Sequence, residues 1–252
     1  MEESYSVLAP IYDALMADVD YAGYVEFFEK STAEFSPDAP KRVIDLGCGT
    51  GSVAVLLAQN GFEVCGIDIS CDMLSAAQKK ASERGARVLF AEQDMCALSL
   101  GGGWGAAICA LDGMNYLPDA DALCKCFSAV AGELCDGGLF VFDMNTKYKY
   151  ENVIGGNSFV YELKDKMLIW QNYYKKRAGV CDFYLTLFEK DGKRWRRSDE
   201  YQCQKMFTEK TVVKLLSDAG FELIRTCSDF GGSPVTEKSE RIFYICRKKR
   251  IV

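Results

Sequence analysis

Short apolar runs alternate with helical patterns over the first 145 residues, and this alternation constrains the fold more than any other feature. The predicted strands cover residues 41–46, 62–67, 86–91, 105–110 and 138–143. The predicted helices lie between them, at about 52–60, 70–83 and 119–134. Strands that alternate with helices are typical of a parallel sheet covered by helices. The sequence therefore predicts an α/β fold.

A different pattern follows over residues 157–206, where apolar and polar residues nearly alternate between the turn signals "KDK", "RAG" and "EKDGKRW". These features predict an antiparallel meander of about four strands, inserted after the fifth parallel strand. Beyond it we expect a helix at 208–218 and two strands at 221–228 and 240–247. The two strands are predicted to form a hairpin at the sheet edge, antiparallel to the rest.

This order of elements predicts two parts of the chain. Residues 1–146 and 207–252 are expected to form one core domain. Residues 147–206 are expected to form an inserted subdomain, rich in aromatic residues, that serves as a substrate lid or as a dimerisation surface. Monomer and homodimer both remain open.

The charge of the chain argues against a polyanionic partner. Its 36 acidic and 30 basic residues give a formal net charge of −6, and only Arg247–Arg250 forms a basic run. A nucleic-acid partner is therefore not expected. The N-terminal stretch is acidic where a signal peptide is basic, and no apolar run reaches the roughly eighteen residues of a membrane span. We expect a cytoplasmic protein with no membrane partner.

Twelve cysteines and the absence of histidine limit the chemistry. The cysteines sit singly inside apolar segments and form no Cys-x-x-Cys pair, which indicates reduced thiols in the core rather than zinc ligands. A chain without histidine cannot use an imidazole base, so serine triads and two-histidine zinc sites are excluded. We therefore expect no metal.

The stretch "VIDLGCGTG" ends the first predicted strand with glycine at positions 47, 49 and 51. A dinucleotide site has the pattern G-x-G-x-x-G, and its third glycine would stand where this chain has Ser52. The turn is free of side chains where the strand ends, so a bulky uncharged group can lie across it. An ordinary glycine-rich turn and a nucleotide site both fit this stretch alone.

Acidic residues at the next strand ends make the signal more specific. The second strand ends in "GIDIS", where the Asp68 carboxylate can accept hydrogen bonds from both hydroxyls of a ribose. The third ends in "AEQDM", where Asp94 can accept a hydrogen bond from an exocyclic amine. The fourth ends in "ALDGMNYL" at the same edge. Consecutive parallel strands place these ends around one crevice, the usual ligand position in an open α/β sheet.

The stretches "DLGCGTG", "GIDIS..ML", "EQDM", "CALDGMNYL" and "GGLFVFDMNT" resemble the ordered motifs of class I S-adenosylmethionine-dependent methyltransferases. The resemblance covers essentially the whole chain and implies a Rossmann-like seven-stranded sheet, with order 3-2-1-4-5-7-6, strand 7 antiparallel and helices on both faces. The stretch "YSVLAPIYDALMADVDYAGYVEFF" and the meander are similar to amino-sugar N,N-dimethyltransferases. The implied activity is in-line methyl transfer to an N or O nucleophile of a small-molecule acceptor.

The resemblance also implies roles for single residues. Those implied to bind S-adenosylmethionine are Tyr5, Tyr12, Asp45, Gly47, Cys48, Gly49, Gly51, Asp68, Ile69, Met73, Gln93, Asp94, Met95 and Leu111. Our own hypothesis is that Tyr5, Asn115 and Tyr116 frame the acceptor, by hydrogen bonding rather than by deprotonation. In the amino-sugar enzymes a histidine helps to orient the acceptor, and this chain has Tyr116 at that position.

Four other readings stay open at this point. Asp112, Asp143 and Asn145 resemble the magnesium ligands of catechol-type O-methyltransferases, although Met144 separates two residues that are adjacent there. Enzymes that methylate adenine amines in nucleic acids carry an Asn-Pro-Pro-Tyr type turn, which this chain lacks. Two further hypotheses remain. One is a non-catalytic protein that binds S-adenosylmethionine, and the other, ranked after it, is an NAD-dependent oxidoreductase.

Overall fold

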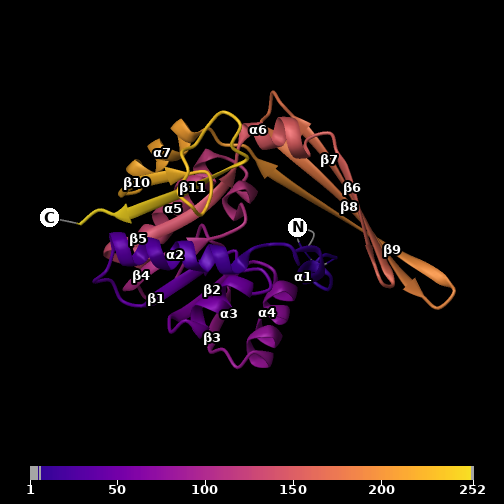
Figure 1. The fold of residues 1–252 in the computed structure, drawn as a ribbon, viewed down its shortest axis with the longest axis horizontal. Coiled ribbons are helices and arrows are strands. Elements are labelled where there is room, and N and C mark those ends of the chain that lie inside the picture. The colour runs from indigo at the N-terminus through magenta and orange to yellow at the C-terminus, as the bar shows by residue number, and fades with distance from the viewer. Residues whose placement is uncertain (1–4, 6, 251–252) are drawn as a thin grey trace.

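The computed structural model describes residues 5 and 7–250, and it contains two sheets. The larger sheet has seven strands in the order β10-β11-β5-β4-β1-β2-β3. When these seven strands are numbered 1 to 7 along the chain and read from the β3 edge, their order is 3-2-1-4-5-7-6. The expected Rossmann-like sheet is therefore confirmed. The second sheet has four antiparallel strands, in the order β6-β7-β8-β9. Both sheets are visible in Figure 1.

The strands of the larger sheet occur where apolar runs were predicted. They are β1 (Arg42–Leu46), β2 (Glu63–Asp68), β3 (Val88–Glu92), β4 (Trp104–Cys109), β5 (Leu134–Asn145), β10 (Phe221–Cys227) and β11 (Arg241–Lys248). Their first five members pair in parallel. The expected antiparallel strand 7 is β11, and it pairs antiparallel with both β5 and β10. The edge strand β10 therefore runs parallel to the first five strands, so the prediction that the hairpin runs antiparallel to the rest was wrong for β10.

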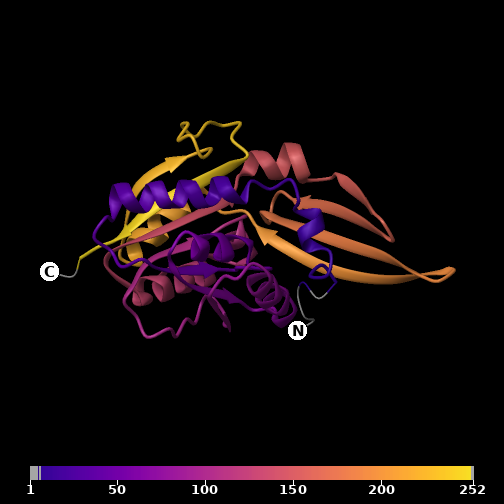
Figure 2. The same ribbon diagram turned by 60° about the horizontal axis from the view of Figure 1, so that its bottom comes forward.

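Helices cover both faces of this sheet (Figures 1 and 2). The main ones are α2 (Tyr21–Phe35), α3 (Ser52–Gln59), α4 (Cys71–Glu83), α5 (Ala120–Glu133) and α7 (Glu209–Asp218). Phe127 of α5 and Leu216 of α7 are fully buried in one apolar cluster. Phe28 of α2 and Leu57 of α3 are fully buried in another cluster. These apolar contacts stabilise the three-layer arrangement and hold the strand ends in place.

Polar side chains cap the starts of two main helices. The Asp119 carboxylate accepts a hydrogen bond from the backbone N–H of Ala122 at 2.8 Å, which fixes the start of α5. The Asp20 carboxylate accepts one from Gly23 at 2.8 Å and begins α2. No helix was predicted before residue 40, so α2 and the short α1 (Tyr12–Leu15) are additions made by the structure.

The second sheet is the predicted meander. Its strands are β6 (Ser158–Leu163), β7 (Lys166–Lys175), β8 (Val180–Asp191) and β9 (Arg194–Lys205), and its three turns fall at the predicted turn signals. The short α6 (Lys147–Lys149) and η2 (Tyr150–Ile154) lead into it from β5. The sheet extends away from the core, with the β8–β9 hairpin projecting farthest (Figure 1).

Residues 7–15, which include α1 and are called the N-terminal segment below, pack against the meander rather than against the larger sheet (Figure 2). Leu8 and Ile11 are buried together with Leu168 of β7 and with Leu185 and Leu187 of β8. The segment therefore lies between the two sheets, close to the carboxyl ends of the core strands. Among the described residues, no helix is long and apolar enough to cross a membrane.

Candidate active site

A cavity of about 410 Å³ lies at the carboxyl ends of β1, β2, β3 and β4. The structure brings most of the predicted site residues together in its wall. The predicted residues that line it are Tyr5, Tyr12, Asp45, Gly47, Cys48, Gly49, Asp68, Ile69, Met73, Gln93, Asp94, Met95, Leu111 and Tyr116. Gly51 and Asn115 are the two predicted residues that lie outside the wall.

Three glycines shape the turn between β1 and α3. Gly47, Gly49 and Gly51 have φ angles of +63°, +53° and +77°, a backbone region that glycine adopts without strain. A Cβ atom added to Gly51 would lie 2.9 Å from the Cβ atom of Ala77 in α4. Gly51 therefore serves the packing of α3 on α4, which explains why it does not line the cavity as expected.

Asp68 ties the end of β2 to this turn. One carboxylate oxygen accepts a hydrogen bond from the backbone N–H of Gly49 at 2.8 Å, and the other accepts one from Ser70 at 2.9 Å. Burial raises the pKa of Asp68, and these two hydrogen bonds oppose that effect. A carboxylate has about four lone-pair sites, so Asp68 can still accept hydrogen bonds from a ligand in the cavity.

Asp45 is a buried carboxyl with an unused oxygen. It lies at the end of β1 and is only 2% exposed, and its Oδ2 atom finds no hydrogen-bond partner in the described chain. Burial raises the pKa of Asp45 to about 8. A positively charged ligand group would favour the ionised form of this carboxyl. The wall of the cavity at Asp45 is therefore suited to a cationic group.

The side of the cavity beyond β3 is held by short local hydrogen bonds. The Asp94 carboxylate accepts one from the backbone N–H of Cys96 at 2.8 Å, and the Gln93 amide oxygen accepts one from Ser99 at 2.9 Å. Met73 contributes a buried apolar side chain from α4, whereas Ile69 is 62% exposed at the rim. These residues offer a flat apolar surface beside hydrogen-bond acceptors.

Tyrosine side chains form the opposite end of the cavity. The ring of Tyr5 lies 6.2 Å from that of Tyr12 and 5.7 Å from that of Tyr116, measured between centroids. The Tyr116 hydroxyl donates a hydrogen bond to the amide oxygen of Gln202 at 3.2 Å. Burial, the largest cause, raises the pKa values of all three phenols above the ordinary value near 10. They therefore stay protonated at neutral pH, so each hydroxyl can donate a hydrogen bond.

Asn115 holds the backbone behind this end instead of facing the cavity. Its side chain is fully buried, donates a hydrogen bond to the Lys205 carbonyl at 2.8 Å and accepts one from the Asn145 backbone N–H at 2.9 Å. Both polar atoms of the amide are thus used within the protein. Asn115 joins β5 to the end of β9 and lies beside the residue, Tyr116, that does reach the cavity.

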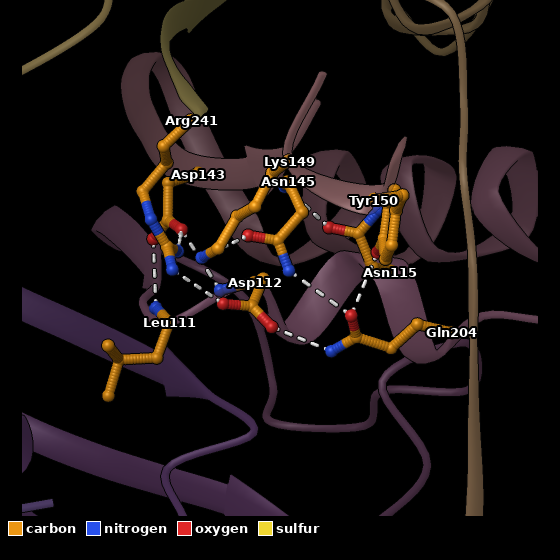
Figure 3. A network of polar contacts seen from close by, with 9 residues as sticks. All are labelled: Leu111, Asp112, Asn115, Asp143, Asn145, Lys149, Tyr150, Gln204 and Arg241. Atoms are coloured by element: carbon orange, nitrogen blue, oxygen red, sulfur yellow. Dashed lines mark hydrogen bonds and ion pairs between the residues drawn. The ribbon is translucent and has the colours of Figure 1, made fainter. Parts of the chain in front are cut away.

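A buried ion-pair network lies beneath the same end (Figure 3). The Arg241 guanidinium contacts the carboxylates of Asp112, at 2.7 Å, and of Asp143. Asp143 also accepts hydrogen bonds from the backbone N–H groups of Leu111 and Asp112, at 2.8 and 2.9 Å. Leu111 and Asp112 have φ angles of +58° and +54°. The network holds this unusual turn, and Leu111 with it, against the cavity.

The same network includes the three residues that resemble magnesium ligands, at the ends of β4 and β5: Asp112, Asp143 and Asn145. The cation between Asp112 and Asp143 is the guanidinium of Arg241, and Asn145 donates to Gln204 at 3.1 Å and accepts from Lys149 at 2.9 Å. Within residues 5 and 7–250, no group of three or more acidic, cysteine or histidine residues could hold a metal ion. The three side chains serve the fold here.

Strand β9 contributes residues that the sequence analysis missed. Tyr201, Gln202 and Cys203 line the cavity. The Glu200 carboxylate accepts hydrogen bonds from the backbone N–H of Tyr5, a residue with a φ angle of +71°, and from that of Val7, both at 2.9 Å. No local signal marks these residues, because their contacts are with distant segments: Glu200 bonds to Tyr5 across 195 positions and Gln202 to Tyr116 across 86.

Comparisons with known proteins agree with this geometry. Residues 43–138 match a family model described as a methyltransferase domain. A Bacillus subtilis (strain 168) protein named as a methyltransferase, YqeM, is 31% identical over 249 residues, which are 98% of this chain and 98% of the relative. An S-adenosylmethionine-dependent methyltransferase from Clostridium acetobutylicum ATCC 824 has a similar structure. Its TM-score is 0.86, with 30% identity over 98% of this chain and 99% of the other.

A more distant likeness shows the fold alone. The sugar N-methyltransferase KedS8 from Streptoalloteichus sp ATCC 53650 has a TM-score of 0.78 and 21% identity, covering 95% of this chain and 93% of the other. Fold and cavity together define a Rossmann-like methyltransferase. The full-length relatives make the family explicit: the chain belongs to the S-adenosylmethionine-dependent methyltransferases, whose cofactor is S-adenosylmethionine.

Proposed function

We propose that this protein transfers the methyl group of S-adenosylmethionine to a nitrogen or oxygen nucleophile of a small molecule. The observation that carries the proposal is the division of one cavity into two chemically different ends. A glycine turn with the buried carboxyl of Asp45 and the half-buried carboxylate of Asp68 forms one end, and neutral tyrosines that can donate hydrogen bonds form the other. The first end suits a nucleoside with a cationic amino-acid tail, and the second suits a polar acceptor.

The proposed cofactor contacts follow the order of the strands. The methionine part lies against Asp45, Gly47, Cys48 and Gly49, and the unused Asp45 oxygen faces its ammonium group. Asp68 accepts hydrogen bonds from the ribose hydroxyls. Ile69, Met73, Gln93, Asp94 and Met95 surround the adenine. Leu111 lies near the sulfonium, and Tyr5 and Tyr12 close over the site.

The chain has to align the reactants and exclude water. S-adenosylmethionine supplies an electrophilic methyl group on a positively charged sulfur, which leaves with the electrons of the carbon–sulfur bond. Leu111 and the glycine turn position that end, and Tyr5 and Tyr116 orient the acceptor lone pair toward it. Such positioning can supply about 7–11 kcal/mol of the barrier reduction.

The residues at the acceptor end favour a nitrogen nucleophile. The side chains there belong to Tyr5, Tyr116, Leu117, Tyr201, Gln202 and Cys203, and none of them is a carboxylate, a lysine or an arginine. An uncharged amine already carries its lone pair, whereas an alcohol has to lose a proton first. This chemistry supports an amine acceptor such as an amino sugar, with Tyr116 where the amino-sugar N,N-dimethyltransferases have histidine.

The meander is proposed to serve as the substrate lid. Tyr201 and Gln202 of β9 line the cavity, so residues 147–206 contribute directly to the acceptor end. This contribution supports the division into a core of residues 1–146 and 207–252 and an inserted lid. A homodimer through the remaining meander surface is compatible with that role.

Replacement of Tyr116 by phenylalanine is expected to lower turnover about tenfold, the equivalent of roughly one lost hydrogen bond. Cofactor affinity should stay within about twofold, because the hydroxyl contacts Gln202 and not the cofactor end. Steady-state kinetics and isothermal titration check the two quantities. Tyr173→Phe is the matched control, because Tyr173 lies on the meander and is 63% exposed. Unchanged turnover in Tyr116→Phe would remove Tyr116 from the mechanism.

The proposed function is tested by separate titrations with S-adenosylmethionine and NAD, followed by a labelling experiment. The protein is incubated with a metabolite extract and S-adenosylmethionine carrying an isotopically labelled methyl group, and mass spectrometry identifies what becomes labelled. We expect binding of S-adenosylmethionine and one labelled amine. Binding without any labelled product would favour a non-catalytic role, and preferential binding of NAD would contradict the proposal.

A further inference from the structure

Lys80 of α4 makes three hydrogen bonds directly behind the glycine turn. Its ammonium group donates to the Asp13 carboxylate at 2.8 Å, to the Thr50 hydroxyl at 2.8 Å and to the Ser52 hydroxyl at 2.7 Å. An ammonium group has three protons, so its capacity is fully used. The Lys80 side chain is only 12% exposed. This is a well-defined polar site rather than a surface contact.

The three partners belong to two different parts of the cavity wall. Thr50 and Ser52 are themselves lining residues in the glycine turn. Asp13 lies in α1, next to Tyr12, which lines the cavity from the N-terminal segment. The Thr50 hydroxyl also donates to the Asp13 carboxylate at 2.6 Å. Lys80 and Thr50 therefore connect the N-terminal segment to the turn.

The other end of the same segment is held by the meander. The Glu200 carboxylate accepts hydrogen bonds from the backbone N–H groups of Tyr5 and Val7, both at 2.9 Å. Residues 7–13 thus form a strap across the cavity, anchored to β9 at one end and to Lys80 at the other. Two tyrosines of the cavity wall lie next to these anchors.

We propose that Lys80 is a positioning residue whose contact with Asp13 latches this strap over the bound cofactor and controls the release of S-adenosylhomocysteine. The inference rests on the proposed function for the identity of the ligand. The latch opens at Asp13, because the Asp13 side chain is 54% exposed and water can hydrate its carboxylate when it separates from Lys80. Lys80 keeps its bonds to Thr50 and Ser52 when the strap opens, so the glycine turn stays in place.

The test compares Lys80→Met and Asp13→Asn with the wild type. We expect S-adenosylhomocysteine to dissociate about fivefold faster from each variant, the size expected for one partly exposed ion pair. Dissociation is followed by stopped-flow displacement with excess S-adenosylmethionine. Lys80→Arg should restore a rate near that of the wild type, and the double variant should be no faster than Lys80→Met, because that variant already lacks the contact with Asp13.

Lys79→Met is the matched control, because Lys79 precedes Lys80 on α4 and its side chain is 77% exposed. It should leave the dissociation rate unchanged. Hydrogen exchange of residues 7–16 without ligand gives a second readout, and this segment should exchange faster in Asp13→Asn than in the wild type. That measurement tests the latch even if the protein binds no S-adenosylhomocysteine, an outcome that would contradict the proposed function instead.

Either of two results would overturn the latch. One is a dissociation rate in Asp13→Asn within about twofold of the wild type, together with unchanged exchange of residues 7–16. The other is an equal increase in dissociation rate in Lys79→Met, which would mean that the effect comes from the charge of α4. If Lys80→Met does not fold, Asp13→Asn alone decides between these results.

Discussion

Replacement of Arg241 by methionine is expected to lower the free energy of unfolding by about 3–5 kcal/mol, the usual cost of leaving a buried charge without its partner. The guanidinium lies between the carboxylates of Asp112 and Asp143, and the Asp143 side chain is only 1% exposed. Methionine keeps the length of the side chain and removes its charge. Urea denaturation followed by circular dichroism gives the free energy.

The same substitution should impair methyl transfer. Asp143 accepts the backbone hydrogen bonds that hold Leu111 and Asp112 at positive φ, and Leu111 lines the cavity. Without Arg241 the buried Asp143 carboxylate loses its ion-pair partner, and the turn that it holds through those two hydrogen bonds is less firmly positioned. We therefore expect a lower turnover number even below the unfolding transition.

Arg225→Met is the control for Arg241→Met, because it also removes an arginine from the C-terminal strands. Arg225 lies on β10, is partly exposed and pairs with Glu34 at 3.0 Å. Its removal should change the free energy of unfolding by at most about 1 kcal/mol. A loss below about 1 kcal/mol in Arg241→Met would show that the network contributes little to the fold.

Replacement of Asp45 by asparagine is expected to weaken the binding of S-adenosylmethionine roughly 10- to 100-fold, the range for one hydrogen bond to a charged group. Asp45 lines the cavity and its Oδ2 atom has no hydrogen-bond partner in the described chain, and an amide cannot offer the negative charge that an ammonium group favours. Isothermal titration at pH 7.5 measures the change. Asp18→Asn, at an exposed turn residue, should bind the cofactor like the wild type.

The same variant is expected to be more stable than the wild type at high pH. The pKa of Asp45 is about 8 in the folded protein and near 3.8 as the ordinary value, so the folded state keeps a proton that the unfolded chain releases. The contribution of this retained proton to the stability of the folded state is complete below pH 4 and is lost as the pH rises through 8.

Relative to Asp45→Asn, the free energy of unfolding of the ligand-free wild type should therefore fall by about 1.4 kcal/mol per pH unit between pH 5 and 7.5. Denaturation curves for both proteins at several pH values give this slope. Parallel curves would show that Asp45 is ionised in the free protein, and would contradict the role of the cofactor's ammonium group in ionising it.

Much of the cofactor end could be predicted because its signals are local. Gly47 and Gly49 follow directly after a buried strand, and Asp68 and Asp94 follow the next two strands. Parallel strands connected by helices bring their carboxyl ends to one edge, so sequence neighbours of those ends become neighbours in space. The structure places all four residues in one cavity wall. Their roles in binding stay predictions.

The acceptor end could be predicted only in part, because it is built by contacts between distant segments. Asn115 sits in the predicted motif, yet its amide bonds to Lys205, 90 positions away, and so turns from the cavity. Glu200 reaches Tyr5 across 195 positions, and Arg241 reaches Asp112 across 129. Periodicity places a residue on the face of its own strand but does not say which segment will cover that face.

Local patterns are enough to predict the α/β class, the order of the elements, the glycine turn and the acidic strand ends, because each follows from residues a few positions apart. The packed fold was needed to show that β9 lines the acceptor end, that Arg241 joins Asp112 to Asp143 and that Lys80 connects α1 to the glycine turn. These contacts depend on burial and charge pairing between surfaces that meet only after the two sheets and the N-terminal segment have packed.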